Sequence, residues 1–246
     1  MDRFLYIAMS GAKEIMNAQT VNANNLANVS TNGFRADFDA MVQRQVFGPG
    51  HENTRHYTQT DGLGTDFTPG NLVGTGRELD IAVNGDGWIS IQAPDGSEAY
   101  TRTGSLKIDA TGLLSTETGL PVLGNEGPIS IPEHQRIQVG ADGTISIQPL
   151  GSGPETVTVV DRIKLVNPDV GQLEKGLDGL IRFTGGQADA DGGVRLFNST
   201  LETSNVNSVE ALVDMISYSR QFEMQIKMMK AAEEQDESVT QLMRIG

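Results

Sequence analysis

Cysteine is absent from this chain of 246 residues, which excludes disulfide bonds, thiolate metal sites and cysteine nucleophiles. No apolar run approaches the 18 residues that a membrane-spanning helix requires, so we expect no membrane insertion. Basic residues are scarce, because 18 Lys and Arg stand against 32 Asp and Glu and leave a net charge of −14. Without a basic cluster, nucleic acid and anionic membrane surfaces are disfavoured as partners.

Glycine and proline are nearly absent from both ends. All nine prolines lie between Pro49 and Pro168, and 26 of the 29 glycines lie between Gly48 and Gly193. All nine methionines lie outside that region, towards the two ends. This distribution predicts an α+β fold, in which a central antiparallel β-rich body, sandwich- or barrel-like, is inserted between long N- and C-terminal helices.

The C-terminal stretch predicts one long helix over 208–243. Asn207, followed three residues later by Glu210, forms a capping-box pattern that places the helix start there. Apolar residues then recur at alternating spacings of three and four, which predicts a seam on one helical face. After Met229 the seam passes through Glu233 and Asp236 and resumes at Val239, Leu242 and Met243.

The N-terminal stretch carries a second seam, with Ala8, Ile15 and Asn22 seven residues apart and Ala12 and Leu26 beside them. We predict that the two seams pair as a coiled coil, because these are the only glycine-poor segments of matching length. An ordinary amphipathic helix on a globular core is the alternative.

Between the helices we expect two segments. Residues 41–76 are polar and rich in turns, which predicts an extended connector. Residues 77–197 show a period of two in short runs separated by Gly and Asp-Gly turns, which predicts many antiparallel strands. The predicted organisation is therefore 1–40 helical, 41–76 connector, 77–197 β-rich body and 198–246 helical. The expected short strands are 106–108, 113–115, 129–131, 137–139, 145–147, 157–160, 163–166, 181–183 and 194–197.

Candidate chemical sites are weak. His51 and His56 stand without further ligands, and five Asp-Gly pairs lack the spacing of a calcium loop, so hairpin turns explain those pairs better. No dinucleotide or phosphate-binding motif is complete. A carbohydrate-binding or hydrolytic β-domain remains an alternative, with Asp80, Asp86 and Glu98 as candidate carboxylates. We predict no catalytic residue, no metal and no cofactor.

The segment Ala23–Arg35 reads ANNLANVSTNGFR and contains four Asn in nine residues. Asn amides compete for backbone hydrogen bonds, and Asn32-Gly33 supports a positive φ, so we interpret the segment as a hydrogen-bonded helix stop. The segment resembles the N-terminal signature of the flagellar rod and hook family. Leu201–Asn207 resembles that family's C-terminal signature, and the stretch 79–124 is also similar to the family.

The resemblance implies a structural subunit of the bacterial flagellar basal-body rod, nearest to a proximal rod member, with distal rod and hook proteins as alternatives. It implies a motility protein that is not an enzyme, is monomeric in solution and is oligomeric in the rod. Implied partners are the proximal rod proteins FlgB and FlgC, the distal rod protein FlgG and the type III export apparatus. It also implies a location in the basal body across the periplasm, after export without a cleaved signal peptide.

The resemblance and the seams together predict an assembly interface made by the terminal helices. Its predicted members are Ala8, Ile15, Asn22, Asn25, Leu26, Asn28, Asn205, Asn207, Leu212, Met215, Ser219, Phe222, Ile226 and Met229.

Overall fold

The computed structural model describes residues 2–45, 56–151, 156–176 and 178–245. It divides into two compact units. The helical unit contains 1–29, 36–66 and 206–246, and the β-rich unit contains 30–35 and 67–205. The predicted α+β fold, with a β-rich body between two terminal helices, is confirmed.

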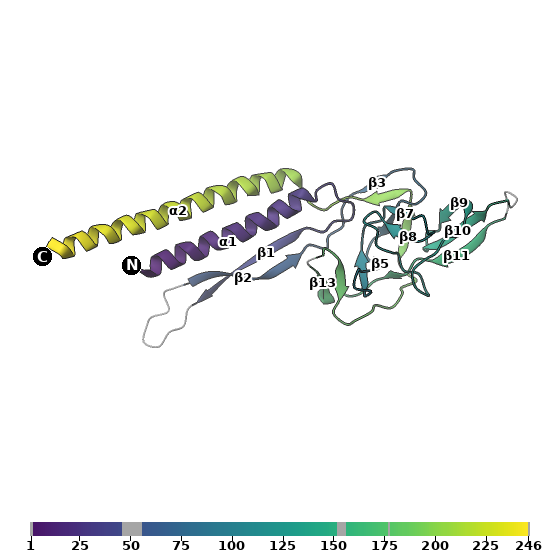
Figure 1. Ribbon diagram of the computed structural model, residues 1–246, viewed down its shortest axis with the longest axis horizontal. Helices are drawn as coiled ribbons and strands as arrows, with labels where there is room; N and C mark the ends of the chain where they lie inside the picture. Colours follow the sequence, from purple (N-terminus) through teal and green to yellow (C-terminus); the bar gives the residue numbers. More distant parts are fainter. Residues whose placement is uncertain (1, 46–55, 152–155, 177, 246) are drawn as a thin grey trace. The chain divides into compact units, whose positions relative to one another are not determined.

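Two long helices form most of the helical unit. Helix α1 spans Asp2–Ala27 and α2 spans Ser208–Ile245, so the predicted C-terminal helix is confirmed almost to the residue. Asn207 Oδ1 accepts hydrogen bonds from the Val209 and Glu210 backbone amides, at 3.1 and 3.5 Å, and thereby caps α2 as expected. The two helices lie side by side and run in opposite directions (Figure 1).

The predicted connector is not an unstructured link. Strands β1 (Asp37–Gln45) and β2 (His56–Thr65) pair as an antiparallel ribbon with an irregularity between Asp39 and Met41. Both strands contact α1, which lies between the ribbon and α2 (Figure 1). The ribbon was missed because its residues are polar and do not show an alternating apolar pattern. His51 lies outside the described residues.

The β-rich unit consists of several small antiparallel sheets. The largest has the order β12-β5-β6-β14-β13, a second has the order β11-β10-β9, and three pairs are β15-β4, β16-β3 and β7-β8. Because no sheet in the described residues closes on itself, the structure does not confirm the sandwich- or barrel-like form. The strands are β3 (Leu72–Gly74), β4 (Ile81–Asn84), β5 (Trp88–Gln92), β6 (Glu98–Thr101), β7 (Leu106–Ile108), β8 (Leu114–Thr116), β9 (His134–Val139), β10 (Thr144–Pro149), β11 (Thr158–Arg162), β12 (Leu165–Val166), β13 (Leu173–Lys175), β14 (Ile181–Phe183), β15 (Arg195–Asn198) and β16 (Thr200–Glu202), and a short 3-10 helix η1 covers Val170–Gln172.

Most of the expected short strands are present, and β7 and β14 match their predicted bounds. Residues 129–131 are an exception, because only an isolated bridge between Ser130 and Leu113 forms there. The larger core contains Ile81, Ile89, Leu106 and Ile145 among many aliphatic side chains. A second, smaller cluster gathers Trp88, Tyr100, Val166, Leu173, Ile181 and Ala188.

Three Asp-Gly pairs make the turns that were predicted for them. Asp95-Gly96 joins β5 to β6, Asp142-Gly143 joins β9 to β10, and Asp178-Gly179 joins β13 to β14. In each turn the glycine has a positive φ, a conformation that glycine adopts without strain. The pairs at 86–87 and 191–192 are different, because neither lies between two consecutive strands that pair with each other.

The aspartate carboxylates in two of these turns predict that the β-rich unit loses stability in acid. The pKa of Asp142 is lowered chiefly by a hydrogen bond from the Thr144 side chain, and that of Asp178 by one from Arg182. A folded-state pKa below the unfolded value of 3.8 stabilises the protein above that pH and ceases to do so as the pH falls through the folded pKa. We therefore expect the urea midpoint of the β-rich unit to stay level from pH 7 to about pH 5 and to fall below about pH 4.

The matched variant for this prediction is Asp142→Asn, which removes one of the titrating carboxyls. Its urea midpoint should depend less steeply on pH below about pH 4 than that of the parent chain. An equally steep dependence in both proteins would show that the turn carboxylates do not cause the acid sensitivity.

Candidate functional site

The seam between α1 and α2 is built from small residues on α1. Ala8, Ala12, Ile15 and Ala18 are buried, so the predicted N-terminal seam is on the inner face of the helix. On α2 the inner face shares Met215, Phe222 and Met229 with the predicted seam, but its other positions lie one residue earlier than predicted. It consists of a buried Ala211 and half-buried residues at alternating spacings of four and three, namely Met215, Tyr218, Phe222, Gln225, Met229 and Ala232.

The predicted α2 seam is therefore correct for only part of its members. Met215, Phe222, Ile226 and Met229 are half-buried, whereas Leu212 and Ser219 are exposed. Leu26 is half-buried and lies near the start of α2, because Asn22, one turn before it, binds Ala211. Phe222 and Ile226 lie farther along α2, on either side of Gln225, which faces Gly11. Leu26 is therefore at a different level of the helical pair from Phe222 and Ile226. The side chains of Val239, Leu242 and Met243 lie outside the described residues.

Two asparagines of the N-terminal signature, Asn25 and Asn28, and the neighbouring Asn22 make side-chain hydrogen bonds with backbone, in agreement with the helix-stop interpretation. Asn22 Nδ2 donates to the Ala211 carbonyl at 2.7 Å and joins α1 to α2. Asn25 makes two hydrogen bonds with the backbone of Asp37, at 2.6 and 2.9 Å, and joins α1 to β1. Asn28 Nδ2 donates to the Asn24 carbonyl at the end of α1, and Gly33 has the expected positive φ of 70°.

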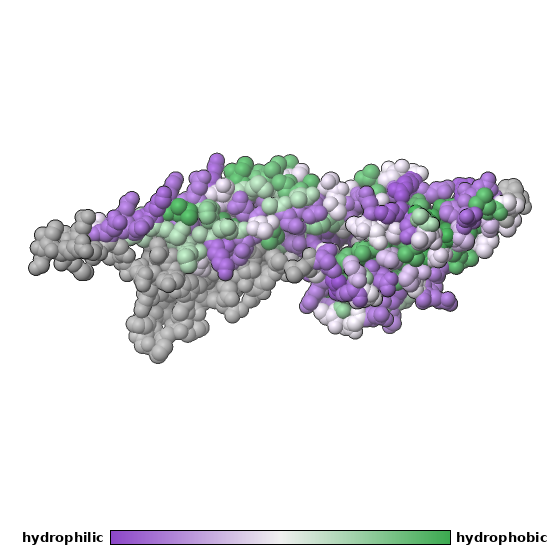
Figure 2. All heavy atoms as spheres, in the orientation of Figure 1, coloured by the Kyte–Doolittle hydropathy of each residue, from purple (hydrophilic) through white to green (hydrophobic). Residues whose placement is uncertain are grey.

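The helical pair carries an apolar outer face, which was not predicted. Val209, Leu212, Val213 and Ile216 on α2 are between 49% and 68% exposed, and Figure 2 shows hydrophobic atoms gathered over this part of the helix. Met9 and Met16 on α1 are both 54% exposed. A shallow groove on the same pair is lined by Ile15, Gln221, Met224, Gln225, Lys227 and Met228.

Exposed apolar residues of the β-rich unit are spread over several short elements. Leu72 and Val73 belong to β3, Val170 to η1 and Phe197 to β15, and a small group lies in and beside the paired strands β10 and β11, namely Leu150, Val157 and Val159. Contiguous apolar surface is typical of interaction sites, whereas single exposed apolar residues are ordinary. The outer face of the helical pair is therefore the better candidate for contacts with other molecules.

The β-rich unit contains a buried charge cluster, defined here as Arg35, Trp88, Arg102 and Glu202 and called the Glu202 cluster. Arg35 Nη2 lies 2.6 Å from Glu202 Oε1, and Arg102 Nη1 lies 3.2 Å from Glu202 Oε2. Both guanidinium groups also stack over Trp88, the only tryptophan, with their central carbons 5.7 and 4.9 Å from the ring centroid. All four residues are at most 4% exposed.

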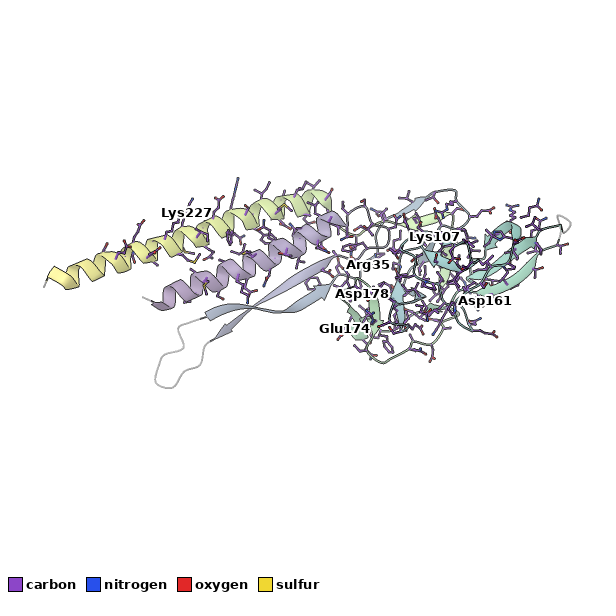
Figure 3. The ribbon with its side chains drawn as sticks, in the orientation of Figure 1. Arg35, Lys107, Asp161, Glu174, Asp178 and Lys227 are labelled. Carbon is purple, nitrogen blue, oxygen red and sulfur yellow. The ribbon has the colours of Figure 1, made fainter. Side chains whose placement is uncertain are left out.

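The Glu202 cluster holds residues 30–35 in the β-rich unit. The Gly33 amide donates to the Glu202 carbonyl at 2.8 Å, and Lys175 Nζ donates to the carbonyl of Arg35, labelled in Figure 3. Gly70 donates its amide to Glu202 Oε1 at 2.9 Å. Gly33 is required here, because a Cβ on it would lie 2.3 Å from the Arg102 carbonyl carbon. Asn205 adds contacts with the Phe34 carbonyl and the Thr68 carbonyl.

Sequence reasoning missed this cluster. Arg35 and Glu202 stand inside the two signature motifs, but they are 167 residues apart and nothing local links them. The sequence nevertheless contained a signal. Arg35 and Glu202 carry opposite charges, and each stands in a signature motif whose asparagines form hydrogen bonds with backbone groups. Burial lowers the pKa of Arg102, while the Glu202 carboxylate acts in the opposite sense.

The candidate carboxylates of a hydrolase have different surroundings and different partners. Asp80 is buried against Arg77 and Thr75, Glu98 pairs with Lys164 at 2.8 Å, and Asp86 is exposed. Within the described residues, no three His, Asp or Glu side chains gather as a metal site would require. The described helices include none that is long and apolar enough to cross a membrane.

Three family models match the chain. Residues 5–35 match the flagella basal body rod protein family, residues 82–147 the flagellar hook protein FlgE/F/G D1 domain, and residues 198–242 the flagellar basal body rod FlgEFG protein C-terminal family. The first covers most of α1 together with 30–35, and the last covers β16 and most of α2.

Full-length relatives are similar along the whole chain. The flagellar basal-body rod protein FlgF of Salmonella typhimurium is 42% identical over 253 residues, with all of both chains covered. FlgF of Escherichia coli is 41% identical with the same coverage. The flagellar basal-body rod protein FlgG of Bacillus subtilis is 33% identical, with 95% of this chain and 96% of that protein covered.

Proposed function

The chain belongs to the flagellar basal-body rod protein family and is a structural subunit of that rod rather than an enzyme, and from this premise we propose that its helical pair makes the contacts with neighbouring subunits. The predicted likeness to the proximal rod member FlgF is confirmed by FlgF relatives that match over the full length. Similarity to FlgG proteins is lower, so the distal rod alternative has weaker support.

One observation carries the proposal, namely the exposed apolar face of α2. Val209, Leu212, Val213 and Ile216 leave apolar side chains in water on a helix that already packs against α1. Covering such a side chain is worth roughly 1.5–3 kcal/mol. A neighbouring rod subunit that brings its own apolar helix would gain this free energy, whereas the isolated chain does not.

The proposal extends to the form of the helical pair, to its partners and to its location. The helices would pair as a coiled coil within the rod, supported by the regular four-three spacing of half-buried residues on α2. The partners would be the other axial proteins FlgB, FlgC and FlgG, reached after type III export to the periplasm. The residues predicted as the assembly interface divide between two roles here. Leu212 would contact a neighbour, whereas Ala8, Ile15 and Asn22 would hold the pair together.

We expect that the double substitution Val213→Asp and Ile216→Asp abolishes swimming while the subunit still folds. Both side chains are exposed in the subunit, so carboxylates are tolerated there, but each would be buried unpaired at an interface. The measurement is swimming in soft agar by cells whose only copy of the protein is the variant. Circular dichroism and Trp88 fluorescence of the purified variant check the fold.

The matched control is Gln235→Asp, which adds a negative charge at an exposed position of the same helix but away from the apolar face. This variant should swim as the parent does. Normal swimming by the double variant, or equal loss in both, would refute the assignment of this face to assembly.

A further inference from the structure

Two amide side chains interrupt the apolar seam between α1 and α2, and each faces a small residue of the other helix. Asn22 of α1 is 9% exposed and donates to the carbonyl of Ala211, the one buried residue among the described side chains of α2. Gln225 of α2 lies over Gly11, the only glycine of α1, where an added Cβ would be 3.1 Å from Gln225 Nε2. The two arrangements are reciprocal, with the amide on α1 in one and on α2 in the other.

The remainder of the seam does little to define how the helices align along their length. The α1 side is mostly alanine, with Ile15 as the one large buried apolar side chain among those described, so shape complementarity alone distinguishes little between alignments one turn apart. A polar residue in an apolar helix seam is known to specify register at a cost in stability. The question is therefore whether the hydrogen bond of Asn22 to Ala211 and the close fit of Gln225 over Gly11 are both available in one alignment alone.

Sliding in either direction breaks both arrangements. One turn along α2, Asn22 would meet Met215 in place of Ala211, and a longer side chain would keep the amide from a helix carbonyl. One turn in the other direction, Asn22 would leave Ala211 and lie level with Asn207 and Ser208, where α2 begins. The next alanine on the α2 inner face is Ala232, too far along the helix for a small slip to reach. Gln225 would meanwhile leave Gly11 and meet residues that carry a Cβ.

We infer that the Asn22–Ala211 and Gln225–Gly11 contacts form a two-point lock that sets the register of the helical pair. The lock is a property of the folded chain. Its consequence for assembly rests on the proposed function, because the register decides which exposed methionines of α1 lie beside which exposed residues of α2.

The test uses the absence of cysteine, which allows spin labels to be placed without background. Labels are attached to the purified full chain at Ala23→Cys and Lys230→Cys, two exposed positions near opposite ends of the pair. In the structure's register they should be separated by about 30 Å along the axis, at 1.5 Å per residue. Double electron–electron resonance should give one narrow distance distribution.

Asn22→Leu combined with Gln225→Leu removes both amides and retains comparable size. We expect a second distance population displaced by about 5 Å, the pitch of one turn, or by a multiple of it. The control, Asn24→Leu with Gln235→Leu, replaces exposed amides on the same helices and should keep the single distribution. If the leucine variant loses helix content, Asn22→Ala with Gln225→Ala replaces it, with the same expected displacement.

One unshifted, narrow distribution in the double variant would overturn the lock, and so would a broad distribution in the parent chain. Swimming assays of the same variants separate the lock from the proposed function. A displaced register with unimpaired swimming would support the lock and refute its consequence for assembly.

Discussion

Replacing Glu202 by glutamine is expected to lower the free energy of unfolding of the β-rich unit by about 3–5 kcal/mol, the usual cost of breaking a buried ion pair from one side. Glutamine has nearly the same shape, so no cavity opens, but Arg35 and Arg102 remain buried without the carboxylate that they share. Because domains of this size have total stabilities of about 5–15 kcal/mol, the loss is a large fraction of the whole.

Urea unfolding followed by the fluorescence of Trp88 measures this loss directly, since both arginines stack over that ring. The matched control is Glu78→Gln, whose partner Arg136 lies 3.2 Å away in an exposed pair. An exposed pair is worth about 0–1 kcal/mol, so the control should change the midpoint little. Similar midpoint shifts in both variants would show that burial does not amplify the Glu202 interactions.

Coupling within the Glu202 cluster provides a second measurement. Arg35→Met alone removes one of two cations that share the Glu202 carboxylate. If the contacts act as one unit, Arg35→Met together with Glu202→Gln should lose less than the sum of the two single losses, because fewer buried charges remain unpaired. Additive losses would mean that the two residues act independently.

The fragment 77–197, which the sequence suggests as the β-rich body, is expected to unfold without a cooperative transition. It lacks Arg35 and Glu202, and it leaves Trp88 without the edge-on contact of Phe67 at 5.7 Å. It also loses β3 and β16, which pair with each other outside those bounds. The missing interactions amount to much of the stability of a small domain.

A chain trimmed along the structural boundaries is expected to behave differently. Ala36 accepts a hydrogen bond from the Asp66 amide at 2.8 Å, so residues 37–65 are replaceable by a short Gly/Ser turn. The resulting chain, 30–36 joined to 66–205, keeps the whole Glu202 cluster and should melt cooperatively when followed by Trp88 fluorescence. A cooperative melt of 77–197 at the same temperature would refute the role of the flanking segments.

Local interactions explain the parts of this fold that sequence reasoning predicted. Asn207 caps α2 through amides two and three residues away, and Asp95-Gly96 and Asp178-Gly179 turn the chain within a few residues. The strands 106–108 and 181–183 follow from alternation and flanking turns. The flagellar rod family is likewise readable from the two signature motifs, because those are continuous in sequence.

By itself, then, the sequence determined the two helices, many of the short strands with their turns, and the family. Only the tertiary structure decided which face of α2 is inward, because apolar residues lie on more than one of its faces and periodicity alone fits Leu212, Ser219 and Ile226 as well as Ala211, Tyr218 and Gln225. It alone paired β1 with β2 and brought Arg35 to Glu202 across 167 residues. The physical reason is the same in each case: these contacts depend on which distant segment is close enough to bury a side chain or pair a charge, and no local pattern records that proximity.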